Sequence, residues 1–507
     1  MGDGWKRYLK GNILVDYDVI VIGSGIGGLT TASLLCQLYN KKVLVLEQHY
    51  RLGGFTHTFK RPPGYEWSVG VHYIGGMHPG RLQRKAFDFI TENQVEWVSF
   101  PDQYDHFIYP DVRVDADKNL KKYIVNLSTA FPEEKAAIKQ YFKDIKRAST
   151  FDMLSHILSD FIMRFIKKLP LFYDAQQSVR QYLDRQFKSE KLKAVLLSEW
   201  GNYGVHSKNA PLWLHAIMVA HYLDGAFYPK GETAVIADSI QKVIEKHGGQ
   251  CVRNAEVTKI LEKDGIVYGV EVKKQDKMLT YKADVVVSDV GYYGTKKLLG
   301  QLTKTDEELY KGAKTCVTVY LGLKEHPKKA GLDGSNFWMF ESYDHYNSNP
   351  LFLSSPPGQS RYYTASATIF CDFDVFKKFV HQPRRKREQA YTDLKQKYQD
   401  DILKRVYKHF PKLKGMVDYA ETSTPLSIVH YMKHYHGSIY GVPRRVGMKK
   451  ITLEKQFKNL YLAGADADIM GVIGSMIGGI GAAGKIVGVS LIGMYMRMKF
   501  AVIRRRR

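Results

Sequence analysis

Cysteines are few in this 507-residue sequence, and the four that occur lie far apart. Cys36, Cys251, Cys316 and Cys371 include no pair with the two-residue spacing of a zinc module, and they are too sparse for a disulfide scaffold. Long apolar runs are also missing, since none reaches the ~20 residues of a transmembrane helix. The first apolar run, Tyr17–Ile22, leads at once into glycine and is too short for the core of a secretory signal. We therefore expect no secretory signal and no single membrane-spanning helix.

Acidic residues are scarce relative to basic ones. The sequence has 75 Lys and Arg against 51 Asp and Glu, a formal net charge of +24. Such an excess favours an anionic partner: a nucleic acid, an acidic substrate or a membrane surface. The most basic internal stretch, Arg384–Arg387, runs into the acidic residues Glu388 and Asp393, and no nucleic-acid-binding module accompanies it. We interpret this stretch as a solvated helix face and expect no nucleic-acid partner.

The strongest local pattern lies near the start of the chain. A short β-type run, Asp18–Ile22, is followed by a glycine-rich turn, Gly23–Gly28, and by a helical stretch, Leu29–Tyr39. A second strand, Val43–Leu46, then ends at Glu47. This strand–turn–helix–strand–acid order is typical of a dinucleotide-binding unit.

Each residue of this unit has a physical role. Gly23 permits a tight turn, Gly25 lets the backbone approach a pyrophosphate, and Gly28 allows close contact between helix and strand. The start of the helix supplies N–H groups and the positive end of its dipole to the phosphates. Glu47 is placed to accept hydrogen bonds from a ribose diol. The unit therefore predicts dinucleotide binding.

A second glycine pair, Gly53 and Gly54, follows within the segment Arg51–Thr58. NAD dehydrogenases do not require such a pair after the ribose acid. In flavoproteins of the amine oxidase and phytoene desaturase type, a segment of this kind runs along the ribityl and pyrophosphate of the flavin. We therefore expect FAD rather than NAD. Because the chain has one dinucleotide fingerprint, NADPH or another electron donor would bind transiently.

The dinucleotide-binding domain is expected to be built from distant parts of the chain. Val252–Val257 and Ile266–Val272 alternate like a β-meander, Asp284–Asp289 resembles a buried strand, and Asn459–Asp466 a strand leading to a turn. We predict an α/β fold with a Rossmann-like FAD-binding domain (parallel sheet plus β-meander) and an interleaved α+β substrate domain. The predicted boundaries are 16–90, 226–300 and 455–485 for the FAD domain, 91–225 and 301–454 for the substrate domain, and 486–507 for an apolar-basic tail.

Two apolar stretches leave alternatives open. Ile486–Met496 and the final Arg504–Arg507 are typical of an interfacial helix with a basic anchor, and also of a packed last helix with a solvated tip. The run Met153–Ile166 is apolar at helical spacing and would face either the substrate-domain core or a membrane at the mouth of a lipid tunnel. We expect a cytoplasmic protein, peripherally attached to an anionic membrane surface through its C-terminal tail.

Separated motifs between Asp18 and Lys485 point to one family. They are Val21–Leu29 with Val45–His49, Gly70–Gly75, His221–Gly231, Thr424–Leu426 with Tyr440-Gly441, and Asn459–Asp466 with Gly471, Gly474 and Gly478. Together they resemble the retinol saturase and carotenoid isomerase branch of the phytoene-desaturase-like flavoproteins. The segments His72–Gly75 and Tyr228–Gly231 are specific to this branch, whereas the first glycine motif is not.

The resemblance implies an amine-oxidase-like two-domain fold in which the flavin faces an apolar tunnel. It also implies an FAD-dependent oxidoreductase that saturates a carbon–carbon double bond of a polyene lipid, a retinoid or a carotenoid, by hydride transfer from flavin N5. Carotenoid isomerisation or desaturation stays open, as does an FAD-stabilised, membrane-associated binding protein without turnover. The residues expected to contact FAD are Gly23, Ser24, Gly25, Gly27, Gly28, Glu47, Gln48, Arg51, Gly53, Gly54, Thr58, Val257, Gly464, Asp466 and Gly474.

Reducing a double bond requires a proton as well as a hydride, so a nearby His or Tyr is a candidate acid. His72, Tyr73, His221 and Tyr440 lie in the motifs that carry the resemblance. A tyrosine in a tunnel is also a common wall residue, so the identity of the proton donor stays open.

Two positions depart from the family pattern. Ser68 stands where an acidic residue is usual, and Glu232 stands where a second glycine is usual. Both positions are expected close to the flavin or to its supporting loop. They raise the question of whether the flavin environment, and with it the direction of the reaction, is the same in this chain as in the rest of the family.

Three histidines near the end of the predicted substrate domain have a spacing that metal sites also show. We expect Val429–Tyr431 and Ile439-Tyr440 to be strands, which would place His430 and His434 on one face, with His436 nearby. No carboxylate or cysteine ligand lies near them in the sequence, and we predict no metal site.

Overall fold

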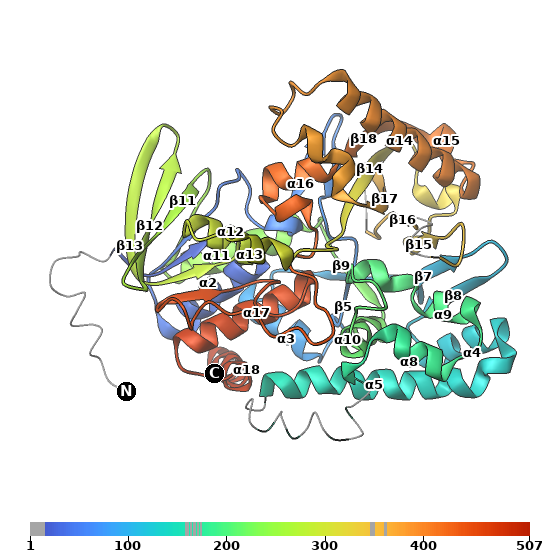
Figure 1. The fold of residues 1–507 in the computed structure, drawn as a ribbon, viewed down its shortest axis with the longest axis horizontal. Coiled ribbons are helices and arrows are strands. Elements are labelled where there is room, and N and C mark those ends of the chain that lie inside the picture. The colour runs from blue at the N-terminus through green and yellow to red at the C-terminus, as the bar shows by residue number, and fades with distance from the viewer. Residues whose placement is uncertain are drawn as a thin grey trace.

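The computed structural model describes residues 16–157, 162, 165, 169, 172, 175–344, 350–358 and 362–506. Two seven-stranded sheets organise these residues, one in each half of the molecule (Figure 1). Segments far apart in the sequence contribute to both sheets, so the chain passes repeatedly between the two halves.

The first sheet has the strand order β10-β2-β1-β13-β12-β11, with β19 beside β13. Its strands are β1 (Tyr17–Ile22), β2 (Val43–Leu46), β10 (Gln250–Val252), β11 (Glu256–Lys263), β12 (Ile266–Lys274), β13 (Lys277–Ser288) and β19 (Leu460–Leu462). The pairs formed by β10, β2, β1, β13 and β19 are parallel, and β13, β12 and β11 continue as an antiparallel meander. This is the predicted combination of parallel sheet and β-meander.

Helices cover both faces of the parallel part of this sheet. The helices of this half are α2 (Ile26–Tyr39), α3 (Leu82–Ile90), α11 (Ala234–Lys246), α12 (Gly291–Leu298), α13 (Lys304–Glu308) and α17 (Gly471–Ile486). Val19 and Val21 of β1 face the core beside α2 and α17, whereas Ile20 and Ile22 face the core beside α12. Successive residues of a strand point to opposite faces, so a strand buried on both faces is apolar throughout.

The second sheet has the order β18-β14-β17-β16-β15-β7-β8. Its strands are β7 (Gln103–Ile108), β8 (Arg113–Asp117), β14 (Thr315–Leu323), β15 (Asn336–Met339), β16 (Leu351–Ser354), β17 (Tyr363–Cys371) and β18 (Val417–Ser423). Its helices are α4 (Leu120–Ala130), α5 (Lys135–Ile157), α8 (Val179–Gln186), α9 (Glu190–Leu196), α10 (Leu212–Tyr222), α14 (Gln389–His409), α15 (Leu413–Met416) and α16 (Pro425–Met432). α14 packs on one face, and α4, α5, α8 and α10 enclose an aromatic core elsewhere in this half.

Two small sheets also hold segments that matter for the site. β3 (Thr58–Arg61) pairs with β4 (Tyr65–Ser68), and β9 (Ala226–Pro229) lies between β5 (Ile74-Gly75) and β6 (Trp97–Ser99). β5 and β9 are about 150 residues apart in the chain, and their pairing brings the His72 segment next to the turn that follows β9.

The C-terminal residues divide between a core helix and a surface helix. α17 ends at Ile486, and α18 (Leu491–Arg506) follows at an angle of 93°. Met494 and Met498 of α18 are buried against α2 and α17, so the segment predicted as one tail is partly anchored in the core. Within the described residues no single helix is both long and apolar enough to cross a membrane, although α17 and α18 together reach that length and composition.

The apolar run predicted over Met153–Ile166 is described only in part. α5 extends to Ile157, and Leu154 packs against the aromatic core of the second half. Of the remainder, Ile162 and Phe165 are exposed, and the other positions lie outside the described residues.

The prediction of strands at Val429–Tyr431 and Ile439-Tyr440 is wrong. Pro425–Met432 forms α16, because Thr424 closes a capping box and Pro425 occupies the first turn, where its missing N–H costs nothing. Ile439-Tyr440 lies in a loop. Within the described part of the chain, no group of three or more His, Cys, Asp and Glu side chains is arranged to hold a metal ion.

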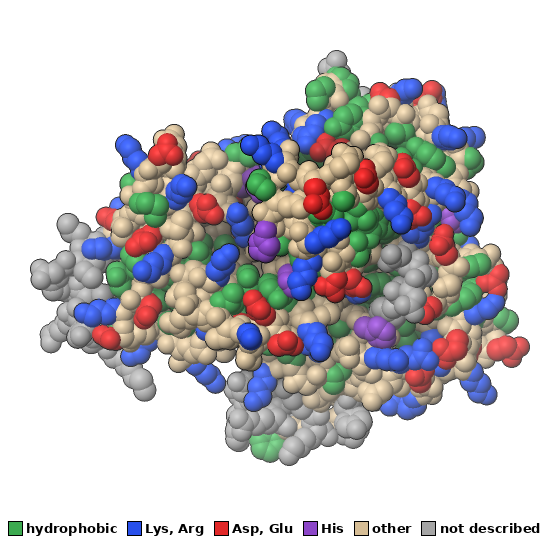
Figure 2. All heavy atoms as spheres, turned by 45° about the horizontal axis from the view of Figure 1, so that its top comes forward, with side chains coloured by type: hydrophobic (Ala, Val, Ile, Leu, Met, Phe, Trp, Pro, Cys, Tyr) green, Lys and Arg blue, Asp and Glu red, His purple; other side chains and the backbone are tan. Residues whose placement is uncertain are grey.

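The basic excess is spread over the surface. On the face shown in Figure 2, Lys and Arg side chains lie among Asp and Glu side chains rather than in one continuous patch. Many of them form ion pairs with neighbours, such as Lys230 with Glu96 at 3.0 Å and Lys246 with Glu92 at 2.6 Å. Exposed pairs of this kind contribute little to stability.

Candidate functional site

A cavity of about 610 Å³ is lined by residues of both large sheets. The carboxyl ends of the parallel strands β1, β2 and β13 open into it through Gly23, Glu47 and Asp289. In open α/β sheets, ligands bind outside the carboxyl ends of the strands. The second sheet contributes an aromatic wall that includes Trp338 and Phe370. One cavity thus connects a glycine turn of the dinucleotide-binding type with an apolar compartment.

The glycine turn after β1 has the geometry that phosphate binding requires. Gly23 has φ +88°, in the left-handed region, and its N–H donates to the Leu46 carbonyl at 2.9 Å. α2 begins at Ile26, immediately after Gly25, so its first N–H groups face the cavity end of the turn. The positive end of this 14-residue helix favours a negatively charged group there.

Glu47 is held in place by the same turn. Its Oε2 accepts hydrogen bonds from the Ser24 N–H at 3.0 Å and from Ser24 Oγ at 2.6 Å, and its Oε1 accepts from the His49 N–H at 2.8 Å. The carboxylate is buried and lines the cavity. Since a carboxylate oxygen has about two acceptor sites, Oε1 keeps capacity for a further donor. Glu47 can therefore accept a hydroxyl of a bound ribose.

The second glycine pair lies against the first turn. The Gly53 N–H donates to the Ser24 carbonyl at 3.0 Å, and Gly53 and Gly54 have φ of +112° and +53°. Arg51 lines the cavity and is oriented by Thr58, which accepts from its Nη1 at 3.1 Å. Thr58 itself does not line the cavity.

Ten of the fifteen predicted cofactor residues line the cavity. They are Gly23, Ser24, Gly25, Glu47, Gln48, Arg51, Gly53, Gly54, Val257 and Asp466. Gly27, Gly28, Gly464 and Gly474 do not line it; a Cβ would collide with neighbouring backbone at Gly27, Gly28 and Gly474 and with the Asp289 side chain at Gly464. A Cβ on Gly27, for example, would lie 2.2 Å from the Gly464 N atom.

Asp466 lines the cavity, but both of its carboxylate oxygens already accept hydrogen bonds from other parts of the protein. Its Oδ2 accepts from the Tyr292 N–H at 2.7 Å and from Tyr310 Oη at 3.1 Å, and its Oδ1 accepts from the Val442 N–H at 2.8 Å. These bonds tie the turn after β19 to α12 and to the loop before residue 450. The role of Asp466 shown by these contacts is to shape the cavity wall.

The four predicted acids separate into two pairs. His72 and Tyr440 line the cavity, whereas Tyr73 and His221 do not. The Tyr73 hydroxyl donates to Asp105 Oδ2 at 3.0 Å and accepts from Asn202 Nδ2 at 2.8 Å. His221 Nε2 accepts from the Gly75 N–H at 2.9 Å. Both are held in buried networks beside the site.

His72 is a neutral imidazole at neutral pH. Burial lowers its pKa to about 4, and its Nδ1 lies 3.4 Å from Ser366 Oγ. Its ring meets Phe352 edge-on, with ring centroids 5.0 Å apart. A neutral imidazole carries one N–H donor and one acceptor, so it can pass a proton from one nitrogen to the other. The Tyr440 hydroxyl has its pKa raised by burial.

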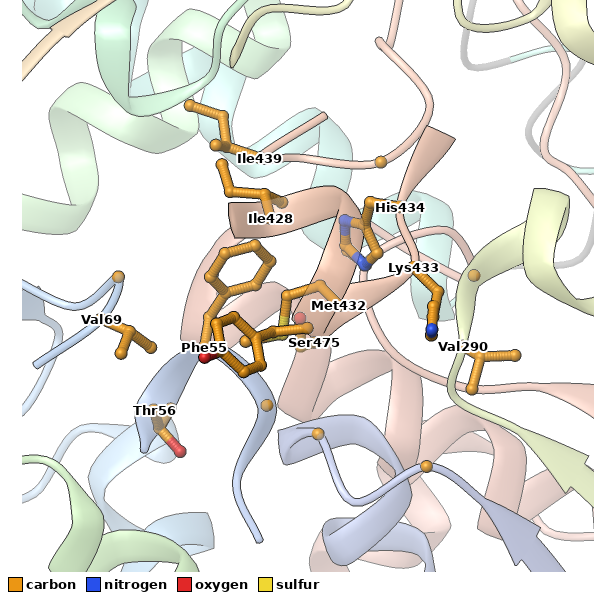
Figure 3. Close-up of a pocket in the computed structure, with 18 of the residues that line it drawn as sticks. Phe55, Thr56, Val69, Val290, Ile428, Met432, Lys433, His434, Ile439 and Ser475 are labelled. Atoms are coloured by element: carbon orange, nitrogen blue, oxygen red, sulfur yellow. The ribbon is translucent and has the colours of Figure 1, made fainter. Parts of the chain in front are cut away.

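The structure also brings residues to the cavity that the sequence patterns did not single out. Asp289 follows β13 and lies against the glycine turn, and its pKa is raised to about 7, first by burial and then by the charge of Glu47. Figure 3 shows Phe55 beside Met432 and Ile428 of α16 on the cavity wall. Asp289 directly follows the carboxyl end of a parallel strand, and this position could have marked it as a site residue.

Comparison with known proteins places the chain in a family. A family model described as an NAD(P)-binding Rossmann-like domain matches residues 21–92. All-trans-retinol 13,14-reductase of Danio rerio is 30% identical over 541 residues, which cover 96% of this chain and 88% of that protein. The chain belongs to the all-trans-retinol 13,14-reductase family. The resemblance seen in the sequence motifs is thereby confirmed.

Two other relatives differ from the all-trans-retinol 13,14-reductase of Danio rerio in the activity that their names state. A protein named inactive all-trans-retinol 13,14-reductase, also from Danio rerio, is 27% identical over 95% of this chain and 87% of its own length. Prolycopene isomerase 1, chloroplastic, from an Oncidium hybrid cultivar is 24% identical over 85% of this chain and 76% of its own length.

A solved structure confirms the predicted fold. Cyclohexylamine oxidase from Brevibacterium oxydans matches with a TM-score of 0.60 at 17% identity and covers 96% of this chain and 100% of that chain. The chain therefore has the amine-oxidase-like fold predicted from its sequence. Together with its membership of the all-trans-retinol 13,14-reductase family, this makes it an oxidoreductase of the flavoenzyme type with a dinucleotide-binding domain.

Proposed function

We propose that the large cavity binds FAD and that the chain uses it to reduce one carbon–carbon double bond of a long apolar polyene, a retinoid or a carotenoid. The observation that carries this proposal is the continuity of the cavity. It joins the Gly23–Gly25 turn and Glu47 to an aromatic wall and to the neutral imidazole of His72. A dinucleotide and an apolar substrate can meet in such a space.

The residues present fit FAD. The left-handed Gly23 forms the tight turn of a pyrophosphate site, Gly25 lines the cavity without a side chain, and Glu47 Oε1 keeps an acceptor site for a ribose hydroxyl. Arg51 supplies a positive charge at the same wall. When bound, FAD supplies hydride transfer at its N5 atom. The electron donor, NADPH or another two-electron donor, is proposed to bind transiently.

The chain's own residues orient the substrate, exclude water and move the proton. Trp338, Phe352 and Phe370 form an aromatic wall suited to a conjugated chain, since large flat rings offer apolar area for such a chain to pack on. We propose that His72 gives the proton that accompanies the hydride. It is the cavity-lining group of the four predicted acids that is neutral, buried and able to take up a proton on one nitrogen while it releases one from the other.

Three substitutions test the assignment of the acid. His72→Gln is expected to lower the rate of polyene reduction roughly 10²–10⁴-fold while FAD stays bound. Tyr440→Phe keeps the ring at the wall and removes only the hydroxyl, so it should leave most of the rate. Tyr73→Phe serves as the control outside the cavity. An unchanged rate in His72→Gln would assign the proton to water or to Tyr440.

Product mass separates the proposed reduction from its alternatives. Anaerobically reduced protein is mixed with all-trans-retinol or with a carotenoid, and the product is analysed by mass spectrometry. A product two hydrogens heavier supports reduction. An isomer of equal mass supports the activity named for the prolycopene isomerase relative, and a product two hydrogens lighter supports desaturation. No product from any polyene would favour a binding protein without turnover; one relative is itself named an inactive all-trans-retinol 13,14-reductase.

We further propose that α18 rests on an anionic membrane surface, in which an apolar substrate would dissolve. Ile492, Met496, Phe500 and Ile503 follow one another at helical spacing and are all exposed, while the opposite side of α18 packs into the core. Basic residues, among them Arg497, lie on the same helix. Each such charge near an anionic surface contributes about 1 kcal/mol, and the apolar side chains add burial.

Negative charges introduced on the exposed face test this attachment without unfolding α18. The double variant Met496→Asp with Phe500→Asp should reduce binding to phosphatidylserine vesicles. The control Met278→Asp changes an equally exposed residue on the β12–β13 hairpin. Equal vesicle binding of both variants and the unaltered protein, at low and at high salt, would refute attachment through α18.

A further inference from the structure

A second, much smaller cavity lies next to the large one. Its volume is about 20 Å³, and a cavity of roughly 10–15 Å³ already holds one water molecule. Trp67 and Ser68 of β4, Tyr228 of β9, Glu232, and Thr364 and Ser366 of β17 all contribute to its wall. His72 lines both cavities. The small cavity therefore places Glu232 and one face of the His72 segment around a space that fits a single water.

Glu232 occupies a backbone conformation that glutamate rarely adopts. Its φ is +70°, in the left-handed region where glycine is the usual residue. Its Oε2 accepts from Tyr228 Oη at 2.6 Å, and the next residue, Thr233, donates through Oγ1 to Ser68 Oγ at 2.9 Å. Both positions that depart from the family pattern, Ser68 and Glu232, thus meet at this cavity. A strained residue held by specific contacts points to a role beyond folding.

The carboxyl of Glu232 is poised to exchange protons at neutral pH. Its pKa is raised to about 7: burial is the main cause, the hydrogen bond from Tyr228 opposes the rise, and the charge of Glu66 adds to it. Glu66 of β4, Tyr228 of β9 and His72, between β4 and β5, are the titratable groups that face the Glu232 carboxyl. The hydroxyls of Thr364 and Ser366 face it from β17. Among the described residues Glu232 has no ion-pair partner. The residue as a whole is half-buried, so part of its surface borders solvent.

We propose that Glu232 relays protons from solvent to His72 through one water in the small cavity. This inference rests on the proposed reduction. As a hydride with its two electrons reaches one carbon of the double bond, one His72 nitrogen gives its proton to the neighbouring carbon. The other nitrogen takes a proton from the water, and the water takes the proton of the Glu232 carboxyl. Glu232 is then protonated again from solvent, and His72, which stays neutral throughout, returns to its starting tautomer before the next turnover. Glu232 does not touch the substrate and acts through His72.

Two substitutions of Glu232 separate the relay from folding. Glu232→Gln keeps the size of the side chain and removes its exchangeable acid. Glu232→Gly suits the left-handed backbone, so it relieves strain rather than adding it. The matched control is Glu96→Gln, which removes an exposed carboxyl that pairs with Lys230, two residues before Glu232.

The first measurement is a single turnover. Protein carrying FAD is reduced with dithionite and mixed without oxygen with all-trans-retinol, and flavin reoxidation is followed from about pH 5.5 to 8.5. The unaltered protein and Glu96→Gln should react more slowly as the pH rises through about 7, because the Glu232 acid is lost. Both Glu232 variants should be roughly tenfold or more slower at low pH and should lose this pH dependence. Variants that retain the rate and pH profile of the unaltered protein would overturn the relay.

The second measurement needs no substrate and no turnover. Infrared spectra of the protein are recorded against pH, and the carbonyl band of a protonated carboxylic acid should disappear near pH 7. Asp289 and Asp105 also titrate near pH 7, so Glu232 is assigned the part of this band that is missing in Glu232→Gln. That part should be shifted in His72→Gln, because the water couples the two side chains. If the unaltered protein reduces no polyene, the proposed reduction is refuted. If it nevertheless shows this band and His72→Gln shifts it, the coupling of Glu232 to His72 is supported. If Glu232→Gln leaves the band unchanged, the relay is overturned even though reduction is observed.

Discussion

Asp289 should destabilise the protein at neutral and alkaline pH, and Asp289→Asn should remove that effect. The carboxyl lies against the glycine turn, so that a Cβ on Gly25 would come within 2.5 Å of its Oδ2. Burial is the main cause of its raised pKa, and the charge of Glu47 adds to it. Asparagine has nearly the same shape and carries no charge. The substitution therefore tests the cost of a charge at this position with little change in packing.

The magnitude follows from the pKa. An aspartate whose pKa is about 7 when folded and 3.8 ordinarily binds its proton more tightly in the folded state. The unfolded state loses that proton first, so ionisation costs the folded state free energy as the pH rises from about 4 to about 7, and the full cost is present above 7. The difference corresponds to about 4 kcal/mol, and relaxation of the neighbours brings it to about 2–4 kcal/mol. Asp289→Asn should thus be more stable than the unaltered protein by this amount at pH 8 and nearly equal to it at pH 4.

Urea denaturation of the protein without cofactor, repeated from pH 4 to pH 8, measures this difference directly. Other buried acids also titrate in this range, but they are shared by both proteins and cancel in the comparison. Asp276→Asn, at the exposed β12–β13 turn, is the control. A difference between Asp289→Asn and the unaltered protein that does not change with pH would show that Asp289 is not a buried, ionising carboxyl, and the reasoning would be wrong.

Three further outcomes are expected. Glu47→Ala should weaken FAD binding roughly 10- to 100-fold in a flavin titration, because it removes the ribose acceptor and the bonds that hold Ser24. Gly27→Ala should lower the free energy of unfolding by roughly 1–3 kcal/mol in urea, because its Cβ would collide with Gly464. Tyr73→Phe should cost roughly 1–3 kcal/mol by leaving buried partners unpaired while the rate of reduction persists; a large loss of rate with unchanged stability would return Tyr73 to the catalytic residues.

The dinucleotide-binding unit could be predicted because its signals are local. The strand, the turn, the helix and Glu47 lie within about 30 residues, and each requirement is imposed by neighbours in the chain. The glycines needed for a left-handed turn or a close backbone approach are visible as residue types. The meander and the strand after residue 459 could also be recognised, because alternation and short buried runs are local patterns as well.

Local patterns were less informative where the same residues are compatible with two different structures. The segment around His430 is apolar and β-branched enough for a strand, but the capping residues Thr424 and Pro425 begin a helix there. The C-terminal run has the composition of a free interfacial tail, yet Met494 and Met498 are buried in the core. Burial depends on which surface a helix finds, and apolar content alone does not specify that surface.

The sequence by itself determined the family, the fold class and the residue types that meet a dinucleotide, because those constraints act between neighbours along the chain. The tertiary structure alone decided which candidate acids reach the cavity. His72 and Tyr73 are adjacent in sequence, but only His72 lines the cavity, whereas Asp105 and Asn202 hold the Tyr73 hydroxyl in a buried network. It also decided that Ser68 and Glu232, more than 160 residues apart, share one small cavity, because pairing of β5 with β9 brings their segments together.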